Sequence, residues 1–141
     1  MSDTTTGLKE EISNGSAIID ASESATVVDG MAMQMLSTGY VKIWTTGTPY
    51  CGAARIITGT DAGVASAVKG DRIGLLYKGE HEVYDSEDTV LALGQPIKPT
   101  GTTGKYGLWV GGTDYADTLA GYVDRTKDAD AKIIMRHVGG I

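Results

Sequence analysis

Short runs in which apolar and polar residues alternate follow one another from about residue 24 to the end of the chain. In residues 40–44, Val41 and Ile43 face one way along an extended chain, and the residues beside them face the other. Turn residues interrupt such runs about every 8–12 residues, which predicts about ten short strands. The expected fold class is all-β, a small Greek-key-like barrel or sandwich. The expected strands are residues 24–28, 31–36, 40–44, 50–57, 72–77, 81–84, 89–93, 95–99, 105–110, 119–123 and 131–136.

Turn sequences predict how some of these strands connect. Asp29-Gly30 is a typical dipeptide of a two-residue hairpin, and Lys78-Gly79-Glu80 has the composition of a second hairpin turn. Residues 95–99 contain two prolines, which donate no backbone hydrogen bond, and this predicts a strand at the edge of a sheet. Residues 64–69 fit a helical turn or a strand equally well.

The first 23 residues differ from the rest because few apolar side chains stand among many Thr, Ser, Asn, Asp and Glu residues. They predict an extended N-terminal arm (1–23) that precedes a single domain (24–141). The arm is expected either to be a loose tail or to become ordered against a neighbouring subunit. In the second case its apolar side chains are the expected partner contacts, namely Leu8, Ile12, Ile18 and Ile19.

Composition limits the classes of partner. The chain has 141 residues, 20 glycines, no Phe and a formal net charge of −6, so it has the size of one domain rich in tight turns. An acidic surface repels phosphate groups, and no run of Lys and Arg is present, so neither nucleic acid nor membrane is expected as a partner. The apolar runs are too short to cross a bilayer and no signal-peptide pattern begins the chain. We therefore expect the protein in the cytoplasm or within a particle assembled there.

Two motifs suggest chemistry, and both depart from their patterns. Residues 100–106 resemble a phosphate-binding loop, but Pro99 replaces its first glycine and Tyr106 replaces the magnesium-binding Ser or Thr. Ser66 and Lys69 match a Ser-x-x-Lys pattern without the companion motifs of penicillin-recognising enzymes. Neither segment therefore predicts a catalytic site.

Titratable side chains predict no ligand set either. His81 and His137 lie far apart in the sequence, without a Cys or His at ligand spacing, and His81 is expected on the surface. The acidic turn at residues 85–88 is a candidate cation site, but its spacing is not that of an EF-hand, and Asp and Ser also favour turns for backbone reasons. The single cysteine, Cys51, is expected to be a small buried apolar side chain. We predict no enzymatic activity, no cofactor and no metal.

The order of segments from residue 68 onward resembles that of the small β-barrel decoration (cement) proteins of tailed-virus capsids. In that family a strand pair is followed by an a-x-G-x-P-V segment, a Gly-containing G-x-V strand, a short charged turn and a terminal apolar strand. The resemblance is one of pattern and covers roughly residues 25–138. The segments that carry it are residues 69–76, 82–84, 90–97, 120–123 and 131–135.

This resemblance implies a structural virion protein that binds the outside of an assembled capsid and stabilises it by bridging capsomers. It implies the major capsid protein as partner, self-association as a homotrimer, and a place on the capsid surface. The residues alone leave two alternatives. One is a hydrolase that uses Ser66 or His81, which is supported only by spacing. The other is a glycan- or ligand-binding β-sandwich with an aromatic stacking platform of Trp44, Tyr50, Tyr106 and Trp109.

Overall fold

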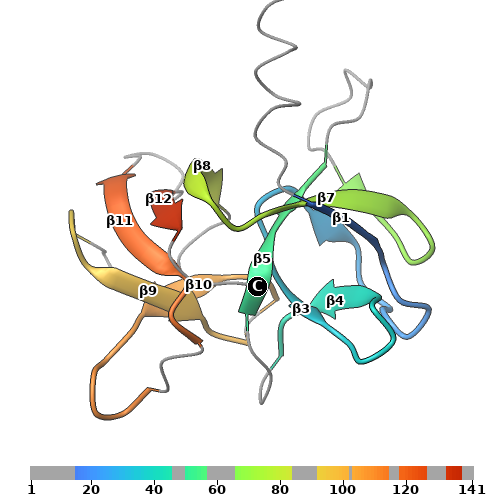
Figure 1. Ribbon diagram of the computed structural model, residues 1–141, viewed down its shortest axis with the longest axis horizontal. Helices are drawn as coiled ribbons and strands as arrows, with labels where there is room; N and C mark the ends of the chain where they lie inside the picture. The colour runs from blue at the N-terminus through green and yellow to red at the C-terminus, as the bar shows by residue number, and fades with distance from the viewer. Residues whose placement is uncertain are drawn as a thin grey trace, which may run out of the picture.

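The computed structural model describes residues 15–45, 50–56, 66–83, 92–101, 103–114, 118–126 and 133–137, with the backbone alone at 81–82, 124–126 and 133–135. The regular elements in this part of the chain are β-strands (Figure 1). They are β1 (Gly15–Ile18), β2 (Val27–Val28), β3 (Ala32–Met35), β4 (Val41–Ile43), β5 (Tyr50–Arg55), β6 (Ser66–Ala67), β7 (Arg72–Leu76), β8 (Gly79–Val83), β9 (Pro96–Pro99), β10 (Tyr106–Leu108), β11 (Gly121–Thr126) and β12 (Ile133–His137).

Two five-stranded antiparallel sheets form most of the molecule (Figure 1). The first sheet has the order β1-β7-β5-β3-β4, and the second sheet has the order β10-β9-β11-β12-β8. The strands β2 and β6 form a separate two-stranded ribbon. The predicted all-β class is confirmed, with a sandwich-like arrangement, and in the part of the chain described no sheet closes into a barrel.

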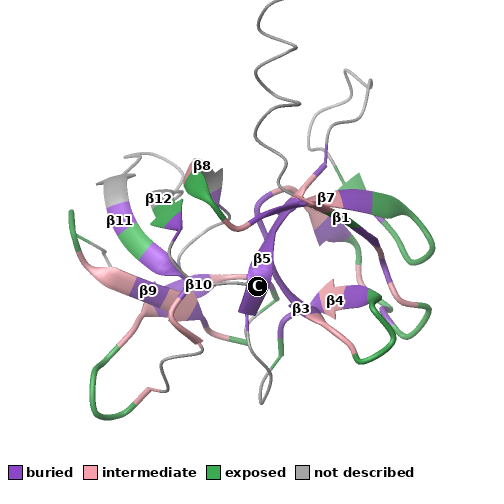
Figure 2. Cartoon of the chain, viewed as in Figure 1, coloured by how far each residue is buried: buried purple, intermediate pink, exposed green. Residues whose placement is uncertain are grey.

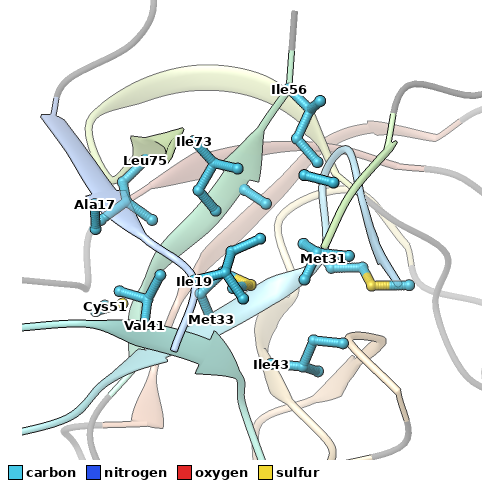
Figure 3. Packing of buried hydrophobic residues seen from close by; sticks show 13 residues of the cluster. Ala17, Ile19, Met31, Met33, Val41, Ile43, Cys51, Ile56, Ile73 and Leu75 are labelled. Atoms are coloured by element: carbon cyan, nitrogen blue, oxygen red, sulfur yellow. The ribbon is translucent and has the colours of Figure 1, made fainter. Parts of the chain in front are cut away.

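The strands β3 and β5 of the first sheet are buried on both faces, and the sheet lies between two apolar cores (Figure 2). Neighbouring residues of one strand serve different cores, as where Leu75 enters the first and Leu76 the second. The first core (Figure 3) joins the first sheet to the ribbon and contains Ala17, Ile19, Val27, Met31, Met33, Val41, Ile43, Cys51, Ala54, Ile56, Ala67, Ile73 and Leu75. The second core joins the two sheets and contains Ala32, Trp44, Tyr50, Ala53, Leu76, Val83, Ile97, Tyr106, Ala120 and Val123.

A β-bulge lets the strand β5 supply side chains to both cores. Opposite β3, Met33 pairs with Gly52 and Gln34 pairs with Tyr50, so that Cys51 is an extra residue in the ladder. Residues three apart in a regular strand face opposite ways. Because of the extra residue, Tyr50 and Ala53 both enter the second core.

Gly52 makes this bulge possible. Its backbone has a φ of +132°, a conformation that residues with a side chain rarely adopt. A Cβ atom at this position would lie 2.9 Å from the carbonyl oxygen of Leu76 on the neighbouring strand. The bulge therefore needs glycine for both its conformation and its space.

Neither predicted hairpin turn joins paired strands. The strand before Asp29-Gly30, β2, pairs with β6, and the strand after it, β3, pairs with β4 and β5. The turn instead docks on β5, where the Asp29 carboxylate accepts the Ile56 N–H at 2.7 Å. At Lys78-Gly79-Glu80 the chain passes from β7 of the first sheet to β8 of the second sheet. Both hairpin predictions are therefore wrong.

The prediction of an edge strand at residues 95–99 is also wrong, because β9 lies between β10 and β11. Its two prolines lie at the ends of the hydrogen-bonded ladders that β9 forms with its neighbouring strands. The Pro96 carbonyl accepts the N–H of Trp109, just beyond β10, at 3.0 Å, and the ring nitrogen has no hydrogen to return. On the other side, pairing with β11 involves only Pro96 and Ile97, so Pro99 lies past the ladder. Proline is tolerated inside a sheet at such positions.

The folded domain begins before residue 24, where the sequence pattern placed its start. The strand β1 pairs with β7 over Gly15–Ile18, and Ile19 forms a bridge with Val41. The Glu23 carboxylate then accepts the Ile43 N–H at 2.8 Å. Of the two alternatives at 64–69, the strand is correct for Ser66–Ala67, the strand β6. Residues 1–14 and 64–65 lie outside the described residues.

We predict that Gly52→Ala destabilises the domain by roughly 2–4 kcal/mol, because it combines an unfavourable φ with a backbone clash. Gly39→Ala is the matched control, because Gly39 also has a positive φ (+91°) but nothing lies within 4 Å of its added Cβ. In urea unfolding, Gly52→Ala should lose at least about 1 kcal/mol more than Gly39→Ala. Equal losses would show that the contact with Leu76 is unimportant.

Candidate functional site

A row of side chains crosses the second sheet, one from each strand or its end. Trp109, next to β10, lies opposite Pro96 of β9, as the hydrogen bond from its N–H shows. Tyr122 of β11 pairs with Pro96 on one side and with Arg136 of β12 on the other, and Arg136 pairs with Glu80 of β8. Directly opposed residues in antiparallel strands share a face of the sheet. We call these five residues the outer row.

The outer row faces solvent because its neighbours in the sequence point inward. Ile97, Val123 and His137 are buried, and successive residues of a strand point to opposite faces. Tyr122 keeps 40% of its surface exposed and the Arg136 side chain keeps 60%. The other three members are half-buried. The second sheet therefore presents an aromatic and proline strip that continues into a cation and an anion.

The charged end of the outer row is a loose ion pair. Arg136 Nη2 lies 3.9 Å from Glu80 Oε2, with side-chain exposures of 60% and 30%. Solvent screens a pair of this kind, so it contributes little to stability. The Arg136 side chain nevertheless keeps most of its surface exposed to solvent.

The loop after β10 is held on the same face by a tighter ion pair. Lys98 Nζ lies 2.6 Å from Asp114 Oδ1, and the other carboxylate oxygen accepts the Val110 N–H at 2.7 Å. The hydrogen bond from Lys98 is the main reason that the pKa of Asp114 lies below its ordinary value. Lys98 stands two residues from Pro96 on β9 and so shares its face. The loop is thereby fixed next to the outer row, with Val110 45% exposed.

Several exposed apolar side chains come from the second sheet and the segments connected to it. In the described part of the chain, the large ones are Tyr40, Val68, Leu93, Val110 and Tyr122. Three of them adjoin the outer row: Tyr122 is a member, Val110 follows Trp109, and Leu93, 72% exposed, belongs to a turn bonded to β11. In that turn the N–H of the next residue donates to the Val123 carbonyl at 2.8 Å.

The aromatic platform expected from the sequence does not form. Trp44, Tyr50 and Tyr106 are buried in the second core, and of the predicted set only Trp109 reaches the outer face. The sequence analysis grouped Trp109 with three aromatic residues that are buried, and it did not identify Tyr122 as a member of the exposed row. Alternation marks Tyr122 as facing away from Val123, but its neighbours become known only from the strand pairing.

The partner contacts predicted on the N-terminal arm fall in different places. Leu8 and Ile12 lie outside the described residues. Ile18 ends β1 and is half-buried. Ile19 is 1% exposed and belongs to the first core (Figure 3), so its side chain stabilises the domain itself and is not available to a partner.

The residues considered for catalysis are not brought together. Ser66 and Lys69 are exposed on and after β6 of the ribbon. The backbone of His81 lies in β8 opposite Met135 of the second sheet. The segment that resembles a phosphate-binding loop is the connection between β9 and β10, and its Gly104 carbonyl accepts the Ala32 N–H at 3.0 Å. It is therefore a contact between the two sheets.

The acidic turn at residues 85–88, considered in the sequence as a candidate cation site, lies outside the described residues. Within the described ranges no three His, Cys, Asp or Glu side chains are grouped so that they could hold a metal ion.

The most buried polar side chains join the two sheets. The hydroxyl oxygens of Tyr50 and Tyr106 lie 3.0 Å apart, and their rings meet edge to face with centroids 6.0 Å apart. The His137 ring stacks on Tyr50, with centroids 6.1 Å apart. Burial raises the pKa of both tyrosines above the ordinary value of 10.0, so their hydroxyls stay protonated. This cluster therefore connects the two sheets and contributes to the packing of the second core.

Cys51 is a buried apolar side chain, as the sequence predicts. It is 3% exposed within the first core. Burial raises the pKa of its thiol to about 12, so almost no thiolate is present near neutral pH.

The comparisons with known proteins leave the family open: no protein-family model matches the chain, and no curated protein matches it significantly. Within the described residues, no helix has the length and apolar character needed to span a membrane. The outer row is therefore the feature from which function can be argued.

We predict that Tyr50→Phe and Tyr106→Phe each destabilise the domain by about 1–3 kcal/mol, because each leaves the other hydroxyl buried without the partner it has here. The double variant removes both hydroxyls and should cost clearly less than the sum of the two. Urea unfolding of all four proteins measures this coupling. Additive losses would mean that the two hydroxyls do not stabilise one another.

A second prediction concerns Cys51. At pH 8 a thiol reagent should label the folded protein at least about a hundredfold more slowly than the protein unfolded in urea, because burial and the raised pKa both protect the thiol. The unfolded sample is the control for intrinsic reactivity. Rapid labelling of the folded protein would contradict the buried position.

Proposed function

We propose that this protein is a structural virion protein that binds the outside of an assembled capsid and bridges neighbouring capsomers. The outer row carries the proposal. It presents Trp109, Tyr122 and Arg136 on one sheet face, and Trp, Tyr and Arg supply much of the binding energy of protein interfaces. The resemblance of the segment pattern to capsid decoration proteins supplies the partner, the major capsid protein.

The way in which the outer row is held favours binding through a preformed surface. Its strands are backed by the second core, and the loop that carries Val110 is fixed by Lys98 and Asp114. A surface that is ordered before binding loses little conformational entropy when the complex forms. For the same contact area, a preformed surface therefore binds more tightly than one that becomes ordered only on binding.

Binding of this kind stabilises a shell by mass action. A protein that binds adjacent capsomers only when they are assembled lowers the free energy of the assembled state. A homotrimer would present several copies of the outer row to one region of the shell. Once one copy had bound, the other copies would be held close to their own binding sites, at a high effective concentration. The net charge of −6 limits adhesion to nucleic acid.

The proposal is tested by co-sedimenting the purified protein with virus capsids that lack their own decoration protein. We expect saturable binding with a fixed number of copies per capsomer, and greater resistance of the loaded shells to heat. Absence of binding to any such shell would refute the proposal.

The same assay tests the predicted arm. A chain that begins at Gly15 keeps β1 and lacks Leu8 and Ile12. Weaker binding by this shorter chain would place a partner contact in the first 14 residues. Equal binding would assign the contact to the folded domain.

A further inference from the structure

We infer that the second sheet opens as one cooperative unit while the first sheet and the ribbon stay folded. The chain then consists of a base, residues 15–77, and a layer docked on it, residues 78–137. Strand pairing, core membership and a short crossover all point to this division, which is independent of the proposed function.

Strand pairing stays within each part. The strands β1 to β7 form the first sheet and the ribbon, and β8 to β12 form the second sheet, so that the two sheets appear as separate groups of strands in Figure 1. Among the described residues no strand ladder joins base and layer. The hydrogen bond from the Ala32 N–H to the Gly104 carbonyl crosses between them. The layer can therefore leave the base without breaking a ladder of the base.

The base has a core of its own. Every residue of the first core lies between Ala17 and Leu75 in the sequence. A segment of about 60 residues that buries such a core has the size of the smaller domains that fold alone. Opening of the layer leaves the first core intact and uncovers the side chains that the base contributes to the second core, namely Ala32, Trp44, Tyr50, Ala53 and Leu76.

The layer, in contrast, depends on the base for its core. The core residues in the described part of the layer are Val83, Ile97, Tyr106, Ala120 and Val123, and all of them belong to the second core, where they pack against the first sheet. A sheet with an apolar face is stable only when another element covers that face. Folding of the layer is therefore coupled to its docking, whereas folding of the base is not.

A short crossover connects the two parts. Only Tyr77 and Lys78 stand between β7 and β8, and Gly79, the first residue of β8, has a φ of +85°. Glycine adopts a wide range of backbone angles, so the chain can change direction here while β7 stays paired. Contiguous segments with separate contacts open as units with different free energies. Because the outer row lies entirely in the layer, this surface can be lost and regained while the base stays folded.

Native-state hydrogen exchange of the whole protein tests this division. Three buried residues are suitable reporters, because their N–H groups donate backbone hydrogen bonds of 2.8–2.9 Å: Ala54 for the base, and Ala120 and Val123 for the layer. After correction for intrinsic rates, the two layer amides should exchange at least about tenfold faster than Ala54. Dilute urea should accelerate both layer amides equally, because opening exposes surface. Equal protection of base and layer, or exchange of the layer amides that does not respond to urea, would overturn the inference.

Two matched variants test whether the layer opens before the base unfolds. Ile73 is 4% exposed in the first core, and Ile97 is 0% exposed in the second core. Each Ile→Val substitution should accelerate the affected exchange about two- to tenfold. Ile73→Val weakens the base equally whether the layer is docked or open, so it should accelerate Ala54 and leave Ala120 and Val123 unchanged. Ile97→Val weakens the docked state itself and should accelerate all three amides.

The outcomes of this comparison are distinct. If Ile73→Val accelerates all three amides by the same factor, the chain unfolds in one step and the inference is wrong. If Ile97→Val accelerates the layer amides and leaves Ala54 unchanged, base and layer unfold independently, which contradicts a docked layer. Far-ultraviolet circular dichroism verifies that both variants keep the fold.

Discussion

The β-bulge at Cys51 and Gly52 is the constraint on which the rest of the structure depends. In a regular strand, successive side chains point to opposite faces of the sheet. Without the bulge, Tyr50 and Ala53 of β5 would therefore point to opposite sides. The extra residue brings both into the second core, where the hydroxyl group of Tyr50 meets that of Tyr106 at 3.0 Å. Cys51 and Ala54 enter the first core in the same way. One strand can therefore anchor two cores, and Gly52 is the residue that allows it.

The connection between β9 and β10 is a second tie between the sheets. The Gly104 carbonyl accepts the Ala32 N–H at 3.0 Å, and an added Cβ at Gly101 would lie 2.5 Å from the Thr45 carbonyl oxygen. Both glycines have positive φ and lie against the first sheet too closely for a side chain. The glycines that suggest phosphate binding in the sequence thus serve close packing. This contact and the second core together hold the strands that present the outer row.

The outer row combines features that suit a contact with another protein. Its aromatic strip offers apolar area next to the fixed loop of Val110, and its charged end carries Arg136 and Glu80, whose side chains are 60% and 30% exposed. The rest of the acidic chain discourages unspecific association with acidic surfaces.

The sequence by itself determined where most strands run and which of their residues share a face, because alternation is a local property of an extended chain. Val41 and Ile43 share a face as that pattern predicts and both enter the first core, whereas Trp44, which faces the other way, enters the second core. It did not determine which strands lie side by side. Asp29-Gly30 is a good hairpin sequence, yet the Asp29 carboxylate binds the N–H of Ile56, far along the chain.

Only the tertiary structure decided the candidate site. The members of the outer row come from Glu80 to Arg136 in the sequence, and strand pairing alone places them together. The same holds for Ile19, an apolar residue in a polar segment that packs in the first core through the bridge with Val41. Pairing depends on contacts between residues far apart in the chain, for which a single sequence carries no local signal.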